Sequence, residues 1–584
     1  MADERGPAAL DAVGNHYTSH ENAATLTGST SPGVKRIEVL SQHINLTERV
    51  ILFIGIFIVA YVYSLDISLR YAYQPVATDS FQTHSLLATI SVLRSVIAAA
   101  AQPTSAKIAD VFGRIELLAV SIVFYVVGTI VDATSTGVAT YSAGAVLYQV
   151  GFTCVSFLVE VILSDVTSLR SRLLYSYVPV SPFLINAWVS GNVTSASLSG
   201  IGWRWGIGMW AIIYPVSLVP LILAIWMTHR RAKAAGALVD YKTPYQLFGT
   251  TKLAKALFWQ LDVAGMLLLI AVLSLVLVPL TLAGGVSSNW HQAHIVAPLV
   301  IGVLCIPVFI FWETKAPHPM LPFHLLKDRM VWGALGIITF MNCAASVQGD
   351  YLYTVLIISF NQSVLTATRI VNIYSFSACL MGILCGFIVY KTRRMKWMIV
   401  AGSCLHLVAF GLLIQFRGGD GANFPGMVAA QVLLGVACGM FTYAALASAQ
   451  AATRHEHLAV MTGAYFACFN VGGAVGNAIS GAIWTQLLPG QLLRDIGNAT
   501  VAEAVYAAPF TAVEDYPWDS PVRNDIVASY RHVQKILCIT GICIATLVLF
   551  CALVLRDPEL PDLQSIAGAE VKDKQNDTKL DDTT

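Results

Sequence analysis

Charged side chains are scarce in this sequence, and their scarcity limits what the protein can be. Asp, Glu, Lys and Arg make up 12% of the 584 residues, whereas soluble domains average about 25%. A soluble fold of this length would have too few charges to cover its surface. The formal net charge is only +1, so the basic patch typical of nucleic-acid-binding proteins is not expected either.

Motifs of enzymes and metal sites are also missing. The eleven cysteines lie inside apolar runs, and none forms a CxxC pair or a Cys/His cluster at zinc spacing. No P-loop, GxSxG or HExxH motif occurs. We therefore expect no catalytic residues, no protein-bound metal and no use of ATP. Residues 1–48 are polar and lack the apolar run of a cleavable signal peptide.

Long apolar runs are what the sequence has instead, since 56% of its residues are hydrophobic. A helix needs about 20 mainly apolar residues to cross a bilayer. We expect fourteen such helices, at 50–69, 85–106, 116–132, 140–164, 173–198, 206–227, 263–283, 293–312, 331–359, 366–390, 397–416, 426–448, 460–486 and 536–555. Lys and Arg are more than twice as frequent in one set of loops as in the other, which places both termini on the cytosolic side.

A charged loop joins the second and third expected helices. Residues 106–114 read Ala-Lys-Ile-Ala-Asp-Val-Phe-Gly-Arg. This stretch resembles the GxxxDxxGR loop of the major facilitator superfamily, with Ala106 in place of the first glycine. The resemblance implies that Asp110, Gly113 and Arg114 form a tight turn and a charge network that locks the inner gate.

The expected fold is therefore an all-α polytopic membrane protein, a major facilitator fold of about fourteen transmembrane helices in a 6 + 2 + 6 arrangement. Substrate would bind between two halves that rock around it. The expected divisions are a disordered cytosolic tail at 1–48, a six-helix bundle at 49–228, a cytosolic linker at 229–257, two extra helices at 258–313, a second six-helix bundle at 330–555 with an extracellular loop at 487–535, and a cytosolic tail at 556–584.

Three stretches narrow the family further. They are Tyr-Val-Tyr-Ser-Leu-Asp at 61–66, Trp-Arg-Trp-Gly-Ile-Gly-Met-Trp-Ala-Ile-Ile-Tyr-Pro at 203–215 and Asp-Tyr-Leu-Tyr at 350–353. Together with the fourteen-helix layout, they resemble fungal siderophore–iron transporters over about residues 35–556. The resemblance implies proton-coupled import of ferric siderophores, usually hydroxamates, with iron carried as its chelate and no cofactor.

Carboxylates inside membrane helices are costly and are usually functional or paired. Asp66, Glu160 and Asp350 lie in apolar runs, and a buried carboxyl that titrates near working pH can carry a proton. We interpret these three as proton-coupling residues. The alternative is structural, with Glu160 paired to Arg94 to hold helices together.

A nearly neutral ferric trihydroxamate suits amide and aromatic side chains, whereas a ferric catecholate is an anion that calls for several basic ones. Arg94 is the only basic residue expected deep in the membrane, so hydroxamates are favoured. The expected substrate-binding residues are Arg70, Tyr71, Tyr73, Arg94, Gln102, Asn186, Trp188, Gln348, Tyr353, Asn372, Tyr374, Phe469 and Asn470. Each aromatic could instead pack between helices or sit in the interfacial belt.

The expected outer loop at 487–535 carries an aromatic-acidic stretch and a glycosylation sequon. Tyr516 and Trp518 could cover the cavity or capture substrate, or simply anchor the loop. Asn498 begins Asn-Ala-Thr and is a candidate glycosylation site on the outer face.

Two alternatives remain open: a proton-driven exporter of drugs or toxins, and a non-transporting nutrient receptor. The fourth and fifth expected helices lack the Arg and the Gly-Pro run typical of drug/proton antiporters, which disfavours an exporter. The expected location is the cell membrane, or alternatively an endosomal or vacuolar membrane. The expected partners are ferric siderophore, protons and the bilayer, with a monomeric chain.

Overall fold

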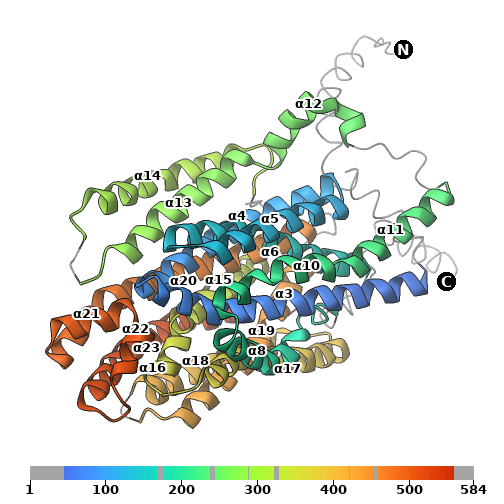
Figure 1. Cartoon of the computed structure of the whole chain (residues 1–584). Helices are drawn as coiled ribbons and strands as arrows, with labels where there is room; N and C mark the ends of the chain where they lie inside the picture. The colour runs from blue at the N-terminus through green and yellow to red at the C-terminus, as the bar shows by residue number, and fades with distance from the viewer. Residues whose placement is uncertain are drawn as a thin grey trace, which may run out of the picture.

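The protein folds as a bundle of long helices (Figure 1). The structure is a computed structural model that describes residues 45–166, 175–236, 244–286, 289–320, 328–419, 421–452 and 458–557. Within these ranges it contains helices and turns but no strand. The predicted tails at 1–48 and 556–584 lie almost wholly outside the described residues.

The N-terminal half contains the first six expected spans. Its elements are α3 (Leu46–Ser80), η3 (His84–Leu86), α4 (Leu87–Val111), α5 (Arg114–Thr134), α6 (Val138–Val166), α8 (Pro182–Ser199), α9 (Gly202–Gly208), α10 (Trp210–Ser217) and α11 (Val219–Ala234). The last three are separated by single residues and form one apolar span, Gly202–Ala234.

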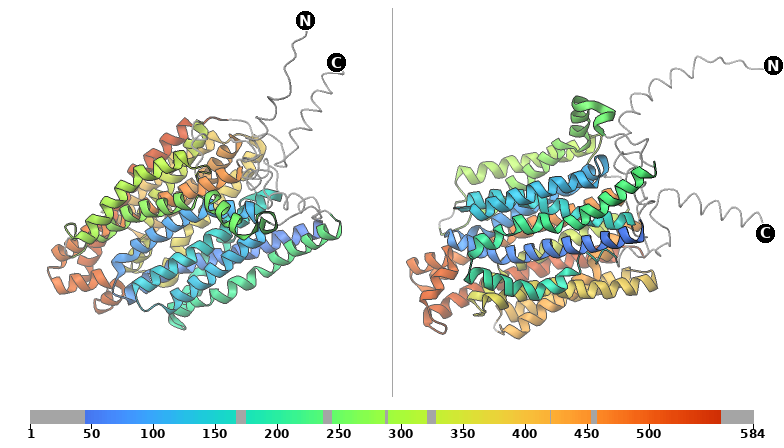
Figure 2. Two further views of the ribbon diagram at one scale, coloured as in Figure 1. Left: turned by 90° about the horizontal axis from the view of Figure 1, so that it is seen from above. Right: turned by 45° about the vertical axis from the view of Figure 1, so that its right-hand side comes forward.

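A helical linker and two extra helices follow. They are α12 (Pro244–Gln260), α13 (Val263–Leu282) and α14 (Ala293–Lys315). α13 and α14 lie at one side of the bundle (Figures 1 and 2). α13 packs against both α4 and α20 (Leu458–Ile496), so it covers a seam between the two halves.

The C-terminal half contains the last six spans and an outer segment, which we define as residues 487–520, up to the start of α23. Its elements are α15 (Arg329–Gly349), α16 (Leu352–Ile358), α17 (Val364–Thr392), α18 (Lys396–Leu413), η5 (Ile414–Gly418), α19 (Phe424–Ala451), α20, α21 (Ala499–Ala507), α22 (Pro509–Ala512), η7 (Val513–Asp515) and α23 (Pro521–Val554). Within the extracellular loop expected at 487–535, α20 continues to Ile496 and α23 begins at Pro521.

The predicted all-α polytopic fold is confirmed, with an approximate helix count. In the described part of the chain, thirteen helices are long and apolar enough to span a bilayer. The expected helix that is not among these thirteen is the fifth, 173–198; it contains α8, which packs against α3 and α17. It carries many polar residues, including Asn186, Ser190 and Thr194, which explains why it falls below the apolar standard of the others.

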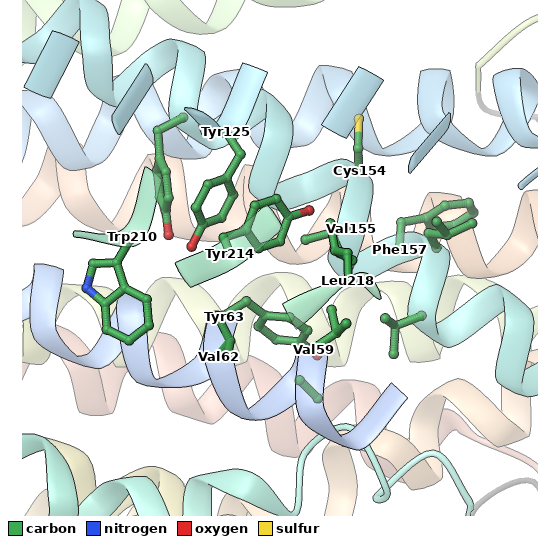
Figure 3. Packing of buried hydrophobic residues seen from close by; sticks show 14 of the residues in the cluster. Val59, Val62, Tyr63, Tyr125, Cys154, Val155, Phe157, Trp210, Tyr214 and Leu218 are labelled. Carbon is green, nitrogen blue, oxygen red and sulfur yellow. The ribbon is translucent and has the colours of Figure 1, made fainter. Parts of the chain in front are cut away.

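Glycines set the packing of the N-terminal half. A Cβ atom at Gly128 of α5 would lie 2.1 Å from the backbone nitrogen of Tyr148, and one at Gly151 of α6 would lie 2.3 Å from that of Tyr125. Small residues at these contacts let α5 and α6 approach closely. As a result the Tyr125 and Tyr148 rings meet at 4.9 Å, and Tyr125 stacks on Tyr214 at 3.8 Å (Figure 3).

Candidate functional site

A buried charge cluster lies in the N-terminal half. Asp66 and Arg70 are four residues apart on α3 and therefore lie on one helix face. Arg70 Nε donates to both Asp66 oxygens, at 2.9 and 3.1 Å, and Nη1 donates to Asp132 Oδ2 of α5 at 2.7 Å. All three side chains are at most 3% exposed. One guanidinium thus bridges two carboxylates out of contact with solvent.

Neighbouring side chains complete this cluster. Arg70 Nη2 donates to the Thr129 hydroxyl at 2.7 Å, and the Tyr125 hydroxyl donates to Asp66 Oδ2. The Arg70 guanidinium carbon lies 3.7 Å from the Tyr148 ring centroid, a cation–π contact. Asp132 Oδ1 is buried and has no hydrogen-bond partner among the described residues. This oxygen is a place where the cluster could hold a proton.

Arg94 of α4 supplies a second positive charge beside Tyr148. Its guanidinium carbon is 5.7 Å from that ring centroid. Its Nε donates to Gln149 Oε1 at 3.1 Å and its Nη1 to Gln74 Oε1 at 3.3 Å. The alternative that Arg94 pairs with Glu160 is therefore not found. Glu160 instead accepts from the Ser176 hydroxyl at 2.7 Å.

The two halves meet at a helix break that carries Asp350. This residue lies between α15 and α16 and is 8% exposed. Its Oδ2 has no hydrogen-bond partner in the described ranges, and Ser480 of α20 is a polar neighbour. The Tyr71 hydroxyl of α3 donates to the carbonyl of Gly349. A side chain of the N-terminal half thus contacts the break at the peptide next to Asp350.

The C-terminal half buries an arginine among amides. Arg417 is fully buried on the π-helical turn η5, a feature often found at functional sites. Its Nη1 donates to Gln348 Oε1 at 2.7 Å, and Gln431 Nε2 donates to the same oxygen at 3.1 Å. Arg417 Nε and Nη2 have no hydrogen-bond partner among the described residues.

Other predicted substrate-binding residues lie along α8 and α17. Asn186 Nδ2 donates to the Ser64 hydroxyl at 2.6 Å. Asn372 Nδ2 donates to the Ser190 hydroxyl at 3.3 Å, which joins the two halves. Trp188, by contrast, is 52% exposed and its ring lies 5.8 Å from that of Phe376.

The remaining members of the predicted set are spread over both halves. Tyr73, Gln102 and Tyr353 are buried, and the Tyr374 hydroxyl contacts Cys438 Sγ at 2.8 Å. Phe469 and Asn470 are half-buried on α20. The described contacts do not bring all thirteen residues into one site, so their role in substrate binding stays a prediction.

Two buried charged residues of the candidate site are absent from the sequence-based set. Asp132 is the last residue of the expected helix 116–132, and a lone acid after Val131 in an apolar run is a usable signal. Arg417 falls just beyond the expected helix 397–416. Its burial depends on the π-helical turn, for which the sequence carries no clear signal.

The predicted gate forms an ion pair. Arg114 Nη1 lies 3.4 Å from Asp110 Oδ1 and 2.8 Å from the carbonyl of Ala109. Gly113 has a φ of 115°, which a glycine adopts without strain. Lys107 donates to the carbonyl of His318 at 2.9 Å. Burial is the main cause that lowers the pKa of His318, and the positive charge of Lys107 lowers it further. The gating role itself stays a prediction.

The outer segment contacts both halves. The backbone N–H of Phe510 and the hydroxyl of Thr511 both donate to Asp79 at the outer end of α3, each at 2.9 Å. Tyr516 is half-buried and packs against the cluster that includes Tyr353 and Trp484.

The other predicted residues of this segment are more open. Trp518 is 43% exposed, with the Arg523 guanidinium carbon 5.7 Å from its ring centroid. Asn498 is exposed and caps α21, accepting from the backbone N–H of Thr500 at 3.0 Å. Glycosylation at Asn498 and a substrate-facing role of the aromatics remain predictions.

No metal centre is visible in the part of the chain that the structure describes. Within it, no three His, Cys, Asp or Glu side chains gather as potential ligands of one ion. The polar groups described above form ion pairs and hydrogen bonds.

The fold and the buried charges define a class of protein, a polytopic transporter of the major facilitator type. The model of the Major Facilitator Superfamily matches residues 52–476. Among solved structures, a peptide transporter POT in complex with sulfate aligns with a TM-score of 0.53 at 15% identity, covering 87% of this chain and 98% of that one. A bacterial homologue of the human lysosomal transporter Spinster aligns with a TM-score of 0.52 at 12% identity, covering 88% of this chain and 98% of that chain.

Sequence relatives narrow the class. Siderophore iron transporter 1 of Saccharomyces cerevisiae is 41% identical, over 94% of this chain and 88% of that protein. Siderophore iron transporter ARN1 of the same yeast is 40% identical, over 91% and 86%. Siderophore iron transporter mirC of Emericella nidulans is 34% identical, over 91% and 88%. The chain belongs to the fungal siderophore–iron transporter family of the major facilitator superfamily.

Proposed function

We propose that this protein imports ferric siderophores together with protons by alternating access, serving iron acquisition. The observation that carries the proposal is the buried Asp66–Arg70–Asp132 cluster in a chain whose relatives are named siderophore iron transporters. The relatives support the substrate class. The cluster supports proton coupling, because it holds two carboxylates around a single arginine.

Asp132 and Asp350 are the proposed proton carriers. Each has a buried oxygen without a hydrogen-bond partner among the described residues, so each can accept a proton without breaking an existing contact. Asp66 is held by Arg70 and Tyr125, so its part is to hold the arginine in place. Glu160 stays a candidate, with Ser176 as its hydrogen-bond donor.

Few positive charges of the protein are free to bind an anionic chelate, which favours a nearly neutral hydroxamate chelate. Arg70 is engaged by two carboxylates and Arg94 by two amides, which leaves Arg417 as the one of these three cations with unsatisfied nitrogens among the described residues. A ferric catecholate carries several negative charges and would need several free cations. A nearly neutral ferric trihydroxamate needs hydrogen bonds, which amides such as Asn186 and Asn372 can give.

Import draws its energy from the membrane potential. One proton entering at 100 mV, inside negative, supplies about 2.3 kcal/mol. That amount corresponds to nearly fiftyfold accumulation of a neutral substrate. The proposed location is the cell membrane, where scarce extracellular chelates can be captured.

Uptake of radio-iron tests this function. Individual ferric hydroxamates are given, with and without a protonophore, to cells that lack other siderophore carriers. We expect accumulation of one or more chelates that collapses with the protonophore. Asp132→Asn and Asp350→Asn should reduce accumulation by up to about fiftyfold, the full voltage contribution of one proton.

Asp519→Asn is the matched control. Asp519 is exposed on the outer segment with a φ of 67°, a conformation that asparagine tolerates. This variant should transport like the wild type. Absence of any accumulation, with the protein at the cell surface, would overturn import and favour an exporter or a receptor. Absence from the cell surface would point to an endosomal or vacuolar membrane.

A further inference from the structure

The two seams between the halves are covered differently. At one, α13 packs over α4 and α20: the hydroxyls of Thr89 and Thr281 lie 2.8 Å apart, and Gly285 N donates to Thr485 O at 2.8 Å. At the other, α8 packs against α17, on the opposite side of the bundle from α13 and α14 (Figure 1).

The α8–α17 seam contains a groove. It is a cavity of about 160 Å³ whose lining includes Trp188, Thr366, Arg369, Ile370, Ile373 and Phe376. The lining is almost entirely apolar, and Trp188 is 52% exposed although it lies within a spanning helix. An apolar wall at that depth faces hydrocarbon rather than water.

The groove runs from the membrane surface toward the bilayer centre. α17 begins at Val364, which the orientation predicted from the loop charges places on the outer side, and it rises 1.5 Å per residue. Arg369 therefore lies roughly 8 Å along the helix from its outer end, and Phe376 about 18 Å. Arg369 and Phe376 are thus about 10 Å apart along the helix, whereas one leaflet is half of the about 30 Å hydrocarbon core, so the groove has the length of the part of an outer-leaflet acyl chain nearest the headgroup.

Arg369 places a positive charge at the outer end of the groove. Its Nη2 donates to Asn192 Oδ1 at 3.1 Å, while its Nε has no hydrogen-bond partner among the described residues. A phosphate is the natural complement, because guanidinium binds phosphate oxygens through paired hydrogen bonds. We propose that this groove binds a phospholipid, with its phosphate on Arg369 and one acyl chain along Ile370, Ile373 and Phe376.

The bound lipid has a consequence for the transport cycle. The groove is formed by both halves, and Gly191 of α8 packs so closely that a Cβ atom there would lie 2.7 Å from the carbonyl of Leu365 on α17. The lipid therefore contacts both halves only while their outer ends touch. Its binding stabilises that arrangement, and separation of the two helices releases it.

Native mass spectrometry of the purified full-length chain tests the site. The probe is palmitoyl-oleoyl phosphatidylglycerol, compared with a diacylglycerol that has the same chains but no phosphate. Wild type should retain one phosphatidylglycerol molecule and little diacylglycerol. Arg369→Gln should lower the occupancy about fivefold, the effect of losing one basic contact near a lipid headgroup.

A second variant fills the groove and leaves the arginine in place. Ile373→Trp should lower phosphatidylglycerol occupancy as Arg369→Gln does. Arg494→Gln changes an exposed arginine of the outer segment and should retain lipid like the wild type. Equal retention in wild type and either groove variant would overturn the proposal, as would equal retention of diacylglycerol. Size-exclusion profiles identify any variant that misfolds, and the other variant then decides.

Discussion

The two halves of the molecule repeat a helix arrangement but treat buried charge differently. Asp66 and Asp350 lie at similar distances from the first residues of α3 and α15, the first helix of each half. In the N-terminal half, Arg70 forms an ion pair with Asp66 of the same helix. In the C-terminal half, the buried Arg417 donates to an amide instead. Asp350 lies at a break between two helices and forms no ion pair with the described residues.

The different treatment of buried charge suits the two halves to different tasks. In the N-terminal cluster, Tyr125 and Thr129 hold Asp66 and Arg70 in place, and the unsatisfied atom among the described residues is Asp132 Oδ1. The C-terminal residues have unsatisfied atoms on both Asp350 and Arg417 among the described residues. Unsatisfied buried groups are costly, so this half gains most from a new partner such as a proton or a substrate.

The largest effect is expected from removing the arginine of the N-terminal cluster. Arg70→Met leaves Asp66 and Asp132 buried without their counter-ion, which costs about 3–5 kcal/mol when one member of a buried pair is lost. Thermal unfolding in detergent should show a large drop in stability and a loss of monodisperse protein. Arg494→Gln, at an exposed position, should leave both unchanged. A stable Arg70→Met variant would contradict the paired-cluster account.

A much smaller effect is expected from the matching change in the other half. Arg417→Met removes a buried cation that has no ion-pair partner in the described part of the chain. Gln431 still donates to Gln348 Oε1, so that acceptor stays satisfied. Replacing buried charge by apolar volume is often neutral. The unfolding free energy should change by less than about 1 kcal/mol, and a loss as large as that of Arg70→Met would remove the contrast between the halves.

Much of the fold could be predicted because length and hydropathy identify membrane helices in a sequence. The contact between Asp66 and Arg70, on one helix, follows from the helical period. The contact between Asp110, near the end of α4, and Arg114, at the start of α5, follows instead from the loop motif and its turn at Gly113. The partners of Asp66 and Arg70 on other helices follow from neither. Asp132 of α5 accepts from Arg70 of α3 because separate helices pack together, which the helical period does not encode. The exposure of Trp188 likewise depends on how α8 meets α17.

The most direct measurement follows protons and iron together. The purified chain is placed in liposomes with an inside-negative potential and a trapped pH dye, and a ferric trihydroxamate is added outside. The account predicts that the interior acidifies as iron accumulates, and that Asp132→Asn or Asp350→Asn abolishes the acidification. Iron accumulation with no change in internal pH would contradict proton coupling through these carboxylates.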